Sequence, residues 1–213
     1  MNYTLKNIIP KPIEETDFNK SEIWGNEIEL QKGKNYIVKS ASGKGKSTFI
    51  SYCCGLRKDF KGELFFNEIN SEQISHDQWV NYRKENISIV NQQLELIPFL
   101  TVWENLLLKN ELTNYKTKEE IEIYLELLDI NTLKNKRCNQ LSIGQQQRTA
   151  IIRALLQPFD WLFMDEPFSH LDKENEEKAS QLIQKIISEQ NASIIITSLG
   201  NDHNFNNLEL LKL

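Results

Sequence analysis

The segment at residues 40–48, SASGKGKST, contains lysine, glycine and hydroxyl side chains in an order that suits phosphate binding. The motif G-x-x-x-x-G-K-[ST] binds nucleotide phosphates when it joins a strand to a helix, and here it lies between the apolar run YIVK and a probable helix, KSTFISYCC. Backbone N–H groups would point at phosphate oxygens, the lysine would reach the β- and γ-phosphates, and the serine after it would bind Mg²⁺. The residues predicted to bind the phosphates are Ser42, Gly43, Lys44, Gly45, Lys46, Ser47 and Thr48.

Ser40 departs from this motif, because the pattern begins with glycine. A serine would cost about 1 kcal/mol if the backbone there needed a conformation that favours glycine, which is small beside the charge-assisted contacts of the loop. Taken alone, the segment is also compatible with a lysine-rich turn. Other motifs are needed to decide between the two interpretations.

A second group of candidate residues lies at residues 160–167, DWLFMDEP, where an apolar strand ends in two adjacent carboxylates. Asp165 is predicted to hold Mg²⁺ through water, and Glu166 to polarise an attacking water. By itself, the segment also fits a strand that leads into a helix with an acidic cap. A phosphate-binding loop earlier in the chain favours the catalytic interpretation.

Residues 141–156, LSIGQQQRTAIIRALL, carry a resemblance to a known family. The run is similar to the signature of the ATP-binding cassette (ABC) ATPases, in which Leu-Ser-Gly-Gly-Gln opens a helix and Gln-Arg and Ala-x-x-x-Arg-Ala-Leu follow. Ile143 is the sole mismatch in the five-residue core. An amphipathic helix with a serine N-cap would explain a helix here, but not this order of residues. The resemblance implies a head-to-tail dimer, in which Ser142, Gly144 and Gln145 meet the ATP held by the neighbouring copy.

Two other segments match the family in the expected order. Gln92 resembles the glutamine that senses Mg²⁺ and the attacking water, and the adjacent Gln93 is the less favoured choice. Residues 169–172, SHLD, resemble the segment that communicates across the dimer. The spacing from Gln92 to Pro98 is most similar to cassettes of lipoprotein release and macrolide export.

The chain departs from the family at Ser198, where the family has a histidine that contacts the γ-phosphate. A serine hydroxyl is shorter and neutral, and would reach the phosphate only through water or a shifted backbone, so hydrolysis is expected to be slow. His203 would substitute only if the intervening turn folds back. Otherwise His203, His76 and His170 are expected to be polar surface or loop residues.

The aromatic ring that stacks on adenine lies somewhat under thirty residues before the loop lysine in this family. Phe18 is the nearest candidate, and Tyr3 and Trp24 are alternatives. These rings would also serve to pack a small β-subdomain, and that is the preferred interpretation of Trp24.

The elements that must position these residues alternate between strands and helices. Several strands are short, continuous apolar runs, which is typical of parallel strands covered by helices on both faces. Strands are predicted at about 27–31, 35–39, 63–67, 87–91, 160–164, 193–197 and 208–213. Helices are predicted at about 46–55, 103–110, 118–129, 144–157 and 173–189.

This pattern and the family resemblance indicate an α/β fold of the P-loop NTPase type. A mostly parallel sheet flanked by helices forms the core, with a small antiparallel β-subdomain and an inserted helical subdomain. Residues 1–213 are expected to form a single ABC ATPase domain. Within it, residues of about 1–92 and 144–213 make the core and the β-subdomain, and residues of about 93–143 make the helical subdomain.

The composition is that of a globular protein, since 39% of the 213 residues are hydrophobic and 26% are charged. A net charge of −5 argues against a nucleic-acid partner, because such proteins usually present a basic face. The cysteines show no metal-ligand spacing and are interpreted as reduced core thiols; they are Cys53, Cys54 and Cys138. No signal sequence and no apolar run of about 20 residues is present, so a cytosolic protein is expected, with any membrane contact through a partner.

The expected function is that of the ATP-binding and ATP-hydrolysing subunit of an ABC transporter, with ATP and Mg²⁺ as cofactors. ATP would close a homodimer, or a heterodimer with a second ABC cassette, and hydrolysis would open it. Integral membrane permease subunits would convert this motion into transport, which places the chain on the cytoplasmic face of the cell membrane. Two alternatives are a soluble ABC ATPase of the iron–sulfur assembly type, and a cassette with weak hydrolysis because of Ser198.

Overall fold

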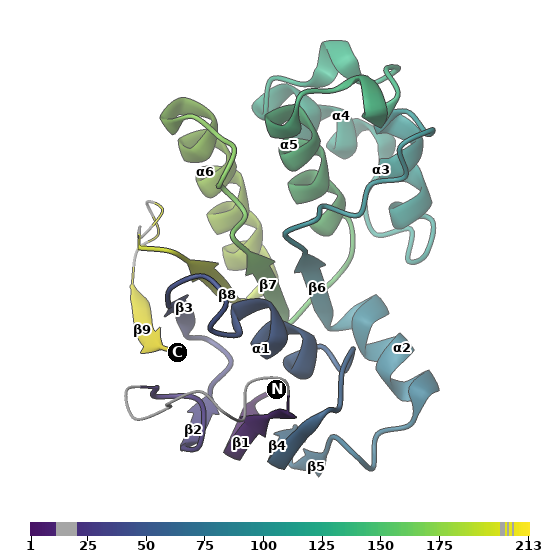
Figure 1. The fold of residues 1–213 in the computed structure, drawn as a ribbon. Coiled ribbons are helices and arrows are strands. Elements are labelled where there is room, and N and C mark those ends of the chain that lie inside the picture. The colour runs from purple at the N-terminus through teal and green to yellow at the C-terminus, as the bar shows by residue number, and fades with distance from the viewer. Residues whose placement is uncertain (12–20, 201–202, 204, 206) are drawn as a thin grey trace.

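A parallel sheet of five strands forms the centre of the molecule (Figure 1). The computed structural model describes residues 1–11, 21–200, 203, 205 and 207–213. Neighbouring strands of this sheet all run parallel, so their C-terminal ends meet at one edge. In order across the sheet, the strands are β6 (Ile87–Val90), β7 (Trp161–Asp165), β8 (Ser193–Ser198), β3 (Asn35–Lys39) and β9 (Leu208–Lys212).

A second, antiparallel sheet lies beside the first and shares a hydrophobic core with it. Tyr3 of this sheet packs edge-on against Trp161 and Phe163 of β7, at ring-centroid distances of 5.4 and 5.8 Å. Its strands, in spatial order, are β2 (Glu27–Leu30), β1 (Tyr3–Pro10), β4 (Phe60–Phe66) and β5 (Ile69–Asn70).

Six α-helices are found in the part of the chain that the structure describes. Four of them begin with a capping box, in which a serine or threonine and a residue three positions later satisfy each other's backbone N–H groups. The helices are α1 (Lys46–Cys53), α2 (His76–Glu85), α3 (Val102–Asn110), α4 (Lys118–Leu127), α5 (Ile143–Ala154) and α6 (Lys173–Gln190).

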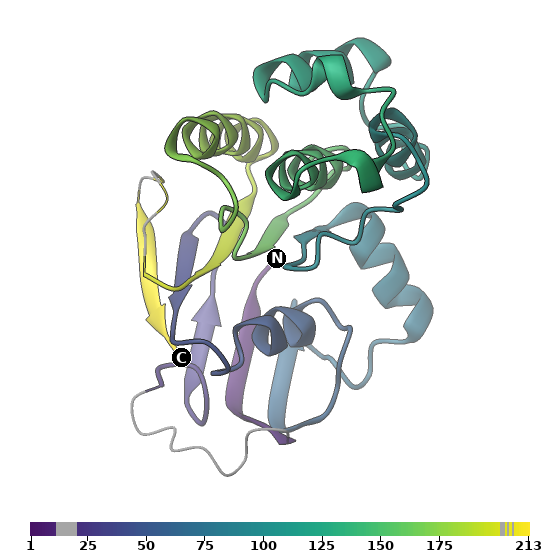
Figure 2. The same ribbon diagram turned by 45° about the horizontal axis from the view of Figure 1, so that its top comes forward.

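The parallel sheet has one hydrophobic core on each face. Alternate residues of a strand point to opposite faces. Leu162 and Met164 therefore join the core made with α5 and α6, while Phe163 joins the core made with α1 and the small sheet. Figure 2 shows α5 and α6 on one side of this sheet and α1 on the other. The parallel sheet therefore lies between α5 and α6 on one face and α1 with the small sheet on the other.

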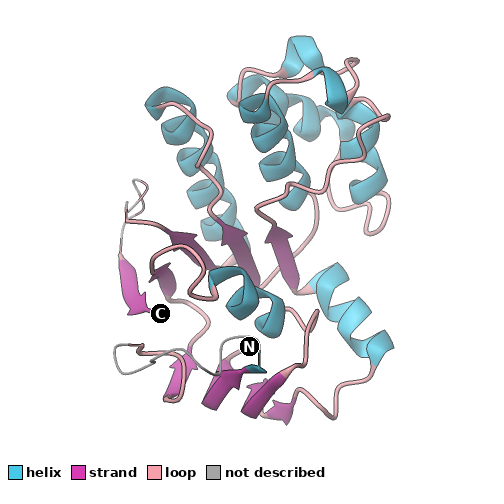
Figure 3. Ribbon diagram, in the orientation of Figure 1, coloured by secondary structure: helices cyan, strands magenta, loops and turns pink. Residues whose placement is uncertain are grey.

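The predicted fold class is confirmed: the chain has a parallel sheet with flanking helices and a small antiparallel sheet. Residues 93–143 contain helices and loops but no named strand, as Figure 3 shows, and their division from the core at residues 93 and 143 stays a prediction. Sequence reasoning missed β1, β5 and α2. The three cysteines are free and buried, as expected.

None of the helices in the described residues combines the length and apolar character needed to cross a bilayer.

Candidate functional site

The loop between β3 and α1 has the backbone of a phosphate-binding loop. Gly43 and Gly45 adopt φ angles of 78° and 96°, which L side chains rarely adopt, and Gly45 caps α1. Ser40 does not have a positive φ. A glycine is therefore not required at position 40, and the expected cost of the serine does not arise.

Lys46 is enclosed by its own loop. It is only 6% exposed, although a lysine is seldom buried without a partner. Its ammonium group donates to the carbonyl oxygens of Ser40 and Ala41, at 3.0 and 3.3 Å, and lies 3.2 Å from a carboxylate oxygen of Glu166. The structure thus brings the predicted phosphate lysine and the predicted catalytic carboxylate into direct contact.

Glu166 stands directly after β7, and its backbone is held on both sides. Its φ is 47°, an unusual value for a residue other than glycine. Its N–H donates to the Thr197 hydroxyl at 3.1 Å, and its carbonyl oxygen accepts from the Gln147 side chain at 3.3 Å. Such local strain persists where neighbours over-determine a conformation, and it is common at active sites.

Asp165 ends β7 and is 5% exposed. One of its carboxylate oxygens accepts a hydrogen bond of 2.6 Å from the Thr197 hydroxyl, which fixes the orientation of the carboxylate. Gln92 is exposed in the turn just beyond β6, the strand next to β7. Asp165 and Gln92 therefore lie at the same edge of the sheet, while their roles toward Mg²⁺ stay a prediction.

The signature helix α5 begins at an exposed tip. Ser142 is its N-cap: the hydroxyl accepts from the Gln145 N–H at 3.3 Å, and the Gln145 side chain accepts from the Ser142 N–H at 3.0 Å. The proton of the Ser142 hydroxyl remains able to donate to a ligand. Ile143, the departure from the family signature, is 48% exposed and makes this tip more apolar.

Gly144 has a packing role within the chain. A Cβ atom at this position would lie 2.8 Å from the carbonyl oxygen of His170, which is closer than real Cβ contacts. The neighbouring Gln147 is buried and accepts from the His170 N–H at 3.1 Å, in addition to its bond to Glu166. The start of α5 is therefore fitted closely against residues 169–172 and the backbone of Glu166.

Replacing Gly144 with alanine should therefore destabilise the protein. Alanine favours a helix interior by about 1 kcal/mol over glycine, but forcing an atom into close-packed backbone typically costs about 1–3 kcal/mol. We expect a net loss of about 1 kcal/mol in the free energy of unfolding, measured by urea denaturation. Gly200→Ala is the control, because a Cβ there meets no atom within 4 Å. Unchanged stability of Gly144→Ala would show that His170 yields freely.

Ser198 ends β8 and is 3% exposed. It lines a pocket of about 450 Å³ together with Glu166 and His203. His203 is not a free surface residue: its Nε2 lies 2.9 Å from the Ser198 hydroxyl and its Nδ1 lies 2.9 Å from a carboxylate oxygen of Glu176. His203 therefore lies beside Ser198, contrary to the preferred expectation that it is a polar surface or loop residue.

The alternatives for the adenine-stacking ring are reduced. Tyr3 and Trp24 are 0% and 1% exposed, and both pack in the core shared by the two sheets. Trp24 lies edge-on to Phe49 and Tyr52. It donates its indole N–H to the Lys44 carbonyl and so stabilises the phosphate-binding loop. Neither ring is accessible to a base. Phe18 lies outside the described residues, so its role stays a prediction.

Sequence reasoning did not single out Thr197 or Glu176, and it named Gln147 only as part of the resemblance to the family signature. The contacts of all three residues join segments that are distant in sequence, so no local pattern reveals them. Thr197 had a weak signal, because it immediately precedes Ser198 at the C-terminal end of a predicted strand.

These residues define a P-loop nucleotide-binding ATPase, in which a phosphate lysine and a carboxylate meet at the C-terminal edge of a parallel sheet. The chain belongs to the ABC transporter family, because the model of that family matches residues 25–169. It is the ATP-binding and ATP-hydrolysing cassette of such a transporter.

Individual relatives agree with this assignment. The chain is 31% identical over 186 residues to the ABC transporter ATP-binding protein YclH of Bacillus subtilis, covering 84% of this chain and 81% of the relative. It is 28% identical to the lipoprotein-releasing system ATP-binding protein LolD of Saccharophagus degradans, covering 82% and 78%. With MJ0796 of Methanocaldococcus jannaschii the identity is 32%, covering 80% and 76%.

A solved structure of MJ0796 has a similar fold. The dimeric, post-hydrolysis state of that cassette, bound to ADP and phosphate, superposes with a TM-score of 0.77 at 28% identity, covering 93% of this chain and 88% of the other.

Proposed function

We propose that the chain binds Mg·ATP in the loop at residues 40–48, pairs head-to-tail with a second cassette, and drives transport through separate membrane subunits. The observation that carries this proposal is the contact of 3.2 Å between Lys46 and Glu166, which joins the phosphate loop to the hydrolytic carboxylate. When ATP binds, its phosphate oxygens would compete with Glu166 for the Lys46 ammonium and displace the carboxylate from it. Glu166 would then be free to accept a proton from the attacking water.

The predicted Mg²⁺ ligands suit that ion chemically. Ser47 offers a hydroxyl, Gln92 an amide oxygen and Asp165 a carboxylate, and hard oxygen ligands of this kind are those that Mg²⁺ prefers. Mg²⁺ in nucleotide sites needs only one or two carboxylates, because the phosphates complete its shell. Bound there, the ion would neutralise charge on the β- and γ-phosphates.

A head-to-tail dimer is supported by the exposed tip of α5. Ser142 and Ile143 are exposed on the surface, where a second copy can reach them. The MJ0796 cassette is dimeric in its solved structure, which supports a dimer of this chain. Light scattering of the Glu166→Gln protein tests it: we expect dimers with Mg·ATP and monomers without nucleotide.

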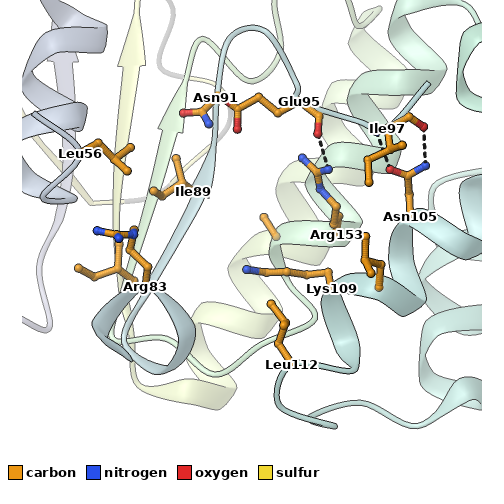
Figure 4. A pocket seen from close by; sticks show the side chains of 13 residues that line it. Leu56, Arg83, Ile89, Asn91, Glu95, Ile97, Asn105, Lys109, Leu112 and Arg153 are labelled. Carbon is orange, nitrogen blue, oxygen red and sulfur yellow. Dashed lines mark hydrogen bonds between the residues drawn. The ribbon is translucent and has the colours of Figure 1, made fainter. Parts of the chain in front are cut away.

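The membrane subunits are proposed to dock in a second pocket, of about 480 Å³, between the core and the helical part of the chain (Figure 4). Leu56, Leu108 and Leu112 give it an apolar rim, since each is about half exposed. Arg83, Lys109 and Arg153 give it three cations, against one carboxylate, Glu95, among its described lining residues. An apolar helix that carries a carboxylate fits this surface.

Lys109 is the cation of this pocket whose charge state a partner carboxylate would change most. Burial, and to a lesser extent the charge of Arg153, lower the pKa of its ammonium to about 8. In the free protein Lys109 therefore loses its charge as the pH rises through about 8. A partner carboxylate would favour the charged form, so docking should weaken as the pH rises through that range.

Lys109→Glu should release the membrane subunits. It places a second carboxylate opposite the partner's own, so we expect retention on the tagged full-length chain, purified from its native host, to fall about tenfold or more. Basal phosphate release should not change. Lys118→Glu, an equal change at an exposed position of α4, should have no effect. Recovery of a soluble scaffold protein in place of membrane subunits would favour the soluble type of ABC ATPase.

A further inference from the structure

Thr197 lies inside the parallel sheet, beside the two carboxylates at the end of β7. It is fully buried near the C-terminal end of β8, the third of the five strands. Its register partner on β7 is Asp165, and its register partner on β3, the strand that leads into the phosphate loop, is Val38. Register partners on neighbouring strands present their side chains on the same face of a sheet. The pairing of β7 with β8 therefore brings the Thr197 hydroxyl to Asp165.

The Thr197 hydroxyl binds two groups at once, and their chemistry fixes the direction of each bond. In the ionised form that binds a metal ion, the Asp165 carboxylate only accepts, so the hydroxyl donates its proton to it at 2.6 Å. The Glu166 N–H only donates, so the hydroxyl oxygen accepts from it at 3.1 Å. One hydroxyl thus joins the side chain of Asp165 to the backbone of Glu166.

These two hydrogen bonds fix geometry that hydrolysis needs. The bond to Asp165 engages one carboxylate oxygen and leaves the other to an ion. The bond from the Glu166 N–H helps to hold that residue at a φ of 47°, which a residue other than glycine keeps only when its neighbours fix it. In that conformation the Glu166 carboxylate lies 3.2 Å from the Lys46 ammonium. A shift of the Thr197 hydroxyl would disturb both carboxylate residues together.

We propose that Thr197 is a positioning residue for ATP hydrolysis, which holds the Mg²⁺-binding carboxylate and the hydrolytic carboxylate in a fixed relation to each other. Groups that are held in place beforehand need no reorganisation in the transition state, which lowers the barrier. Because Thr197 is fully buried, it acts through Asp165 and Glu166 and not by direct contact with ATP. The inference rests on the proposed roles of these two residues at the same site.

Thr197→Val in the full chain tests this inference, because valine keeps the β-branched shape and lacks the hydroxyl. We expect kcat for phosphate release to fall about tenfold, the effect of one lost hydrogen bond to a charged group. Mn²⁺, the probe for Mg²⁺, should bind about tenfold more weakly to the complex with ATP, as measured by electron paramagnetic resonance. Affinity for ATP in EDTA, measured by calorimetry, should change less than about twofold, because the phosphate loop keeps its residues.

Thr197→Ser separates positioning from support of the sheet. Serine keeps the hydroxyl but lacks the methyl group that favours a strand, so the protein should unfold at a lower temperature. Its kcat and its Mn²⁺ affinity should stay within about threefold of the wild type. A role limited to packing predicts the reverse order, with Thr197→Val active and Thr197→Ser impaired, and that result would overturn the inference.

Two further variants complete the experiment. Thr197→Ala also lacks the hydroxyl and should lose as much of kcat, so it takes the place of Thr197→Val if the valine variant does not fold. Ser193→Ala removes a buried hydroxyl at the other end of β8, where it accepts from the Gly33 N–H at 2.7 Å, and should keep the wild-type kcat. Wild-type kcat and Mn²⁺ affinity in folded Thr197→Val protein would overturn the inference alone. A wild-type chain that does not hydrolyse ATP would instead overturn the proposed function.

Discussion

Replacing Lys46 with alanine is expected to abolish measurable ATP binding, with a loss in affinity of more than about a hundredfold. The side chain is buried, and it is the cation that the phosphate loop encloses. Its removal takes away charge-assisted hydrogen bonds to the phosphates. It also removes the ammonium that lies 3.2 Å from the Glu166 carboxylate, so the unpaired carboxylate would repel the negatively charged phosphates of ATP. Titration calorimetry with Mg·ATP measures the effect.

The control for this variant is Lys58→Ala, which removes the same charge from an exposed position after α1 and should bind ATP as the wild type does. Circular dichroism must show that both variants are folded. Wild-type affinity in a folded Lys46→Ala protein would refute the assignment of the phosphate loop.

Glu166→Gln is expected to lower kcat by about 10²–10³-fold while ATP binding persists, because an amide cannot accept the proton of the attacking water. Loss of the carboxylate charge also removes the competitor of the phosphates for Lys46, so affinity for ATP should rise. Phosphate release and calorimetry on the same preparation separate the two effects.

Glu63→Gln, the same chemical change at an exposed position of β4, should hydrolyse ATP at the wild-type rate. If Glu166→Gln also retained that rate, another group would have to be the base, and the hydrolytic role of Glu166 would be lost.

The motifs could be predicted because their chemistry is local. The phosphate loop, the carboxylates after β7 and the capped start of α5 each depend on a few consecutive residues, and the helices and strands around them have clear periodicity. Helix α2 was missed because its sequence, HDQWVNYRKE, is polar and buries only Trp79 fully. Strand β1 was missed because the pairing that stabilises it, with β2 and β4, joins segments far apart in sequence.

The contacts that orient the site could not be predicted for the same reason. Gln147 meets Glu166 from nineteen residues away, and Glu176 meets His203 from twenty-seven residues away. Only the packing of α5 and α6 against the sheet brings these groups together. The conformation of Ser40 also depends on the fold, because the sequence alone does not reveal whether its φ is positive.

The segment that follows Gln92 is fastened to the helices on its far side (Figure 4). The Arg153 guanidinium donates to the carbonyl oxygens of Leu94 and Glu95, each at 2.6 Å, and the Asn105 side chain binds both the N–H and the carbonyl of Ile97. Between the end of β6 and Leu94 only three residues lie outside these attachments, and Gln92 is the middle one. A displacement of α3 relative to the sheet would therefore be transmitted through Ile97 to those three residues, so a shift of the proposed docking pocket would also move Gln92.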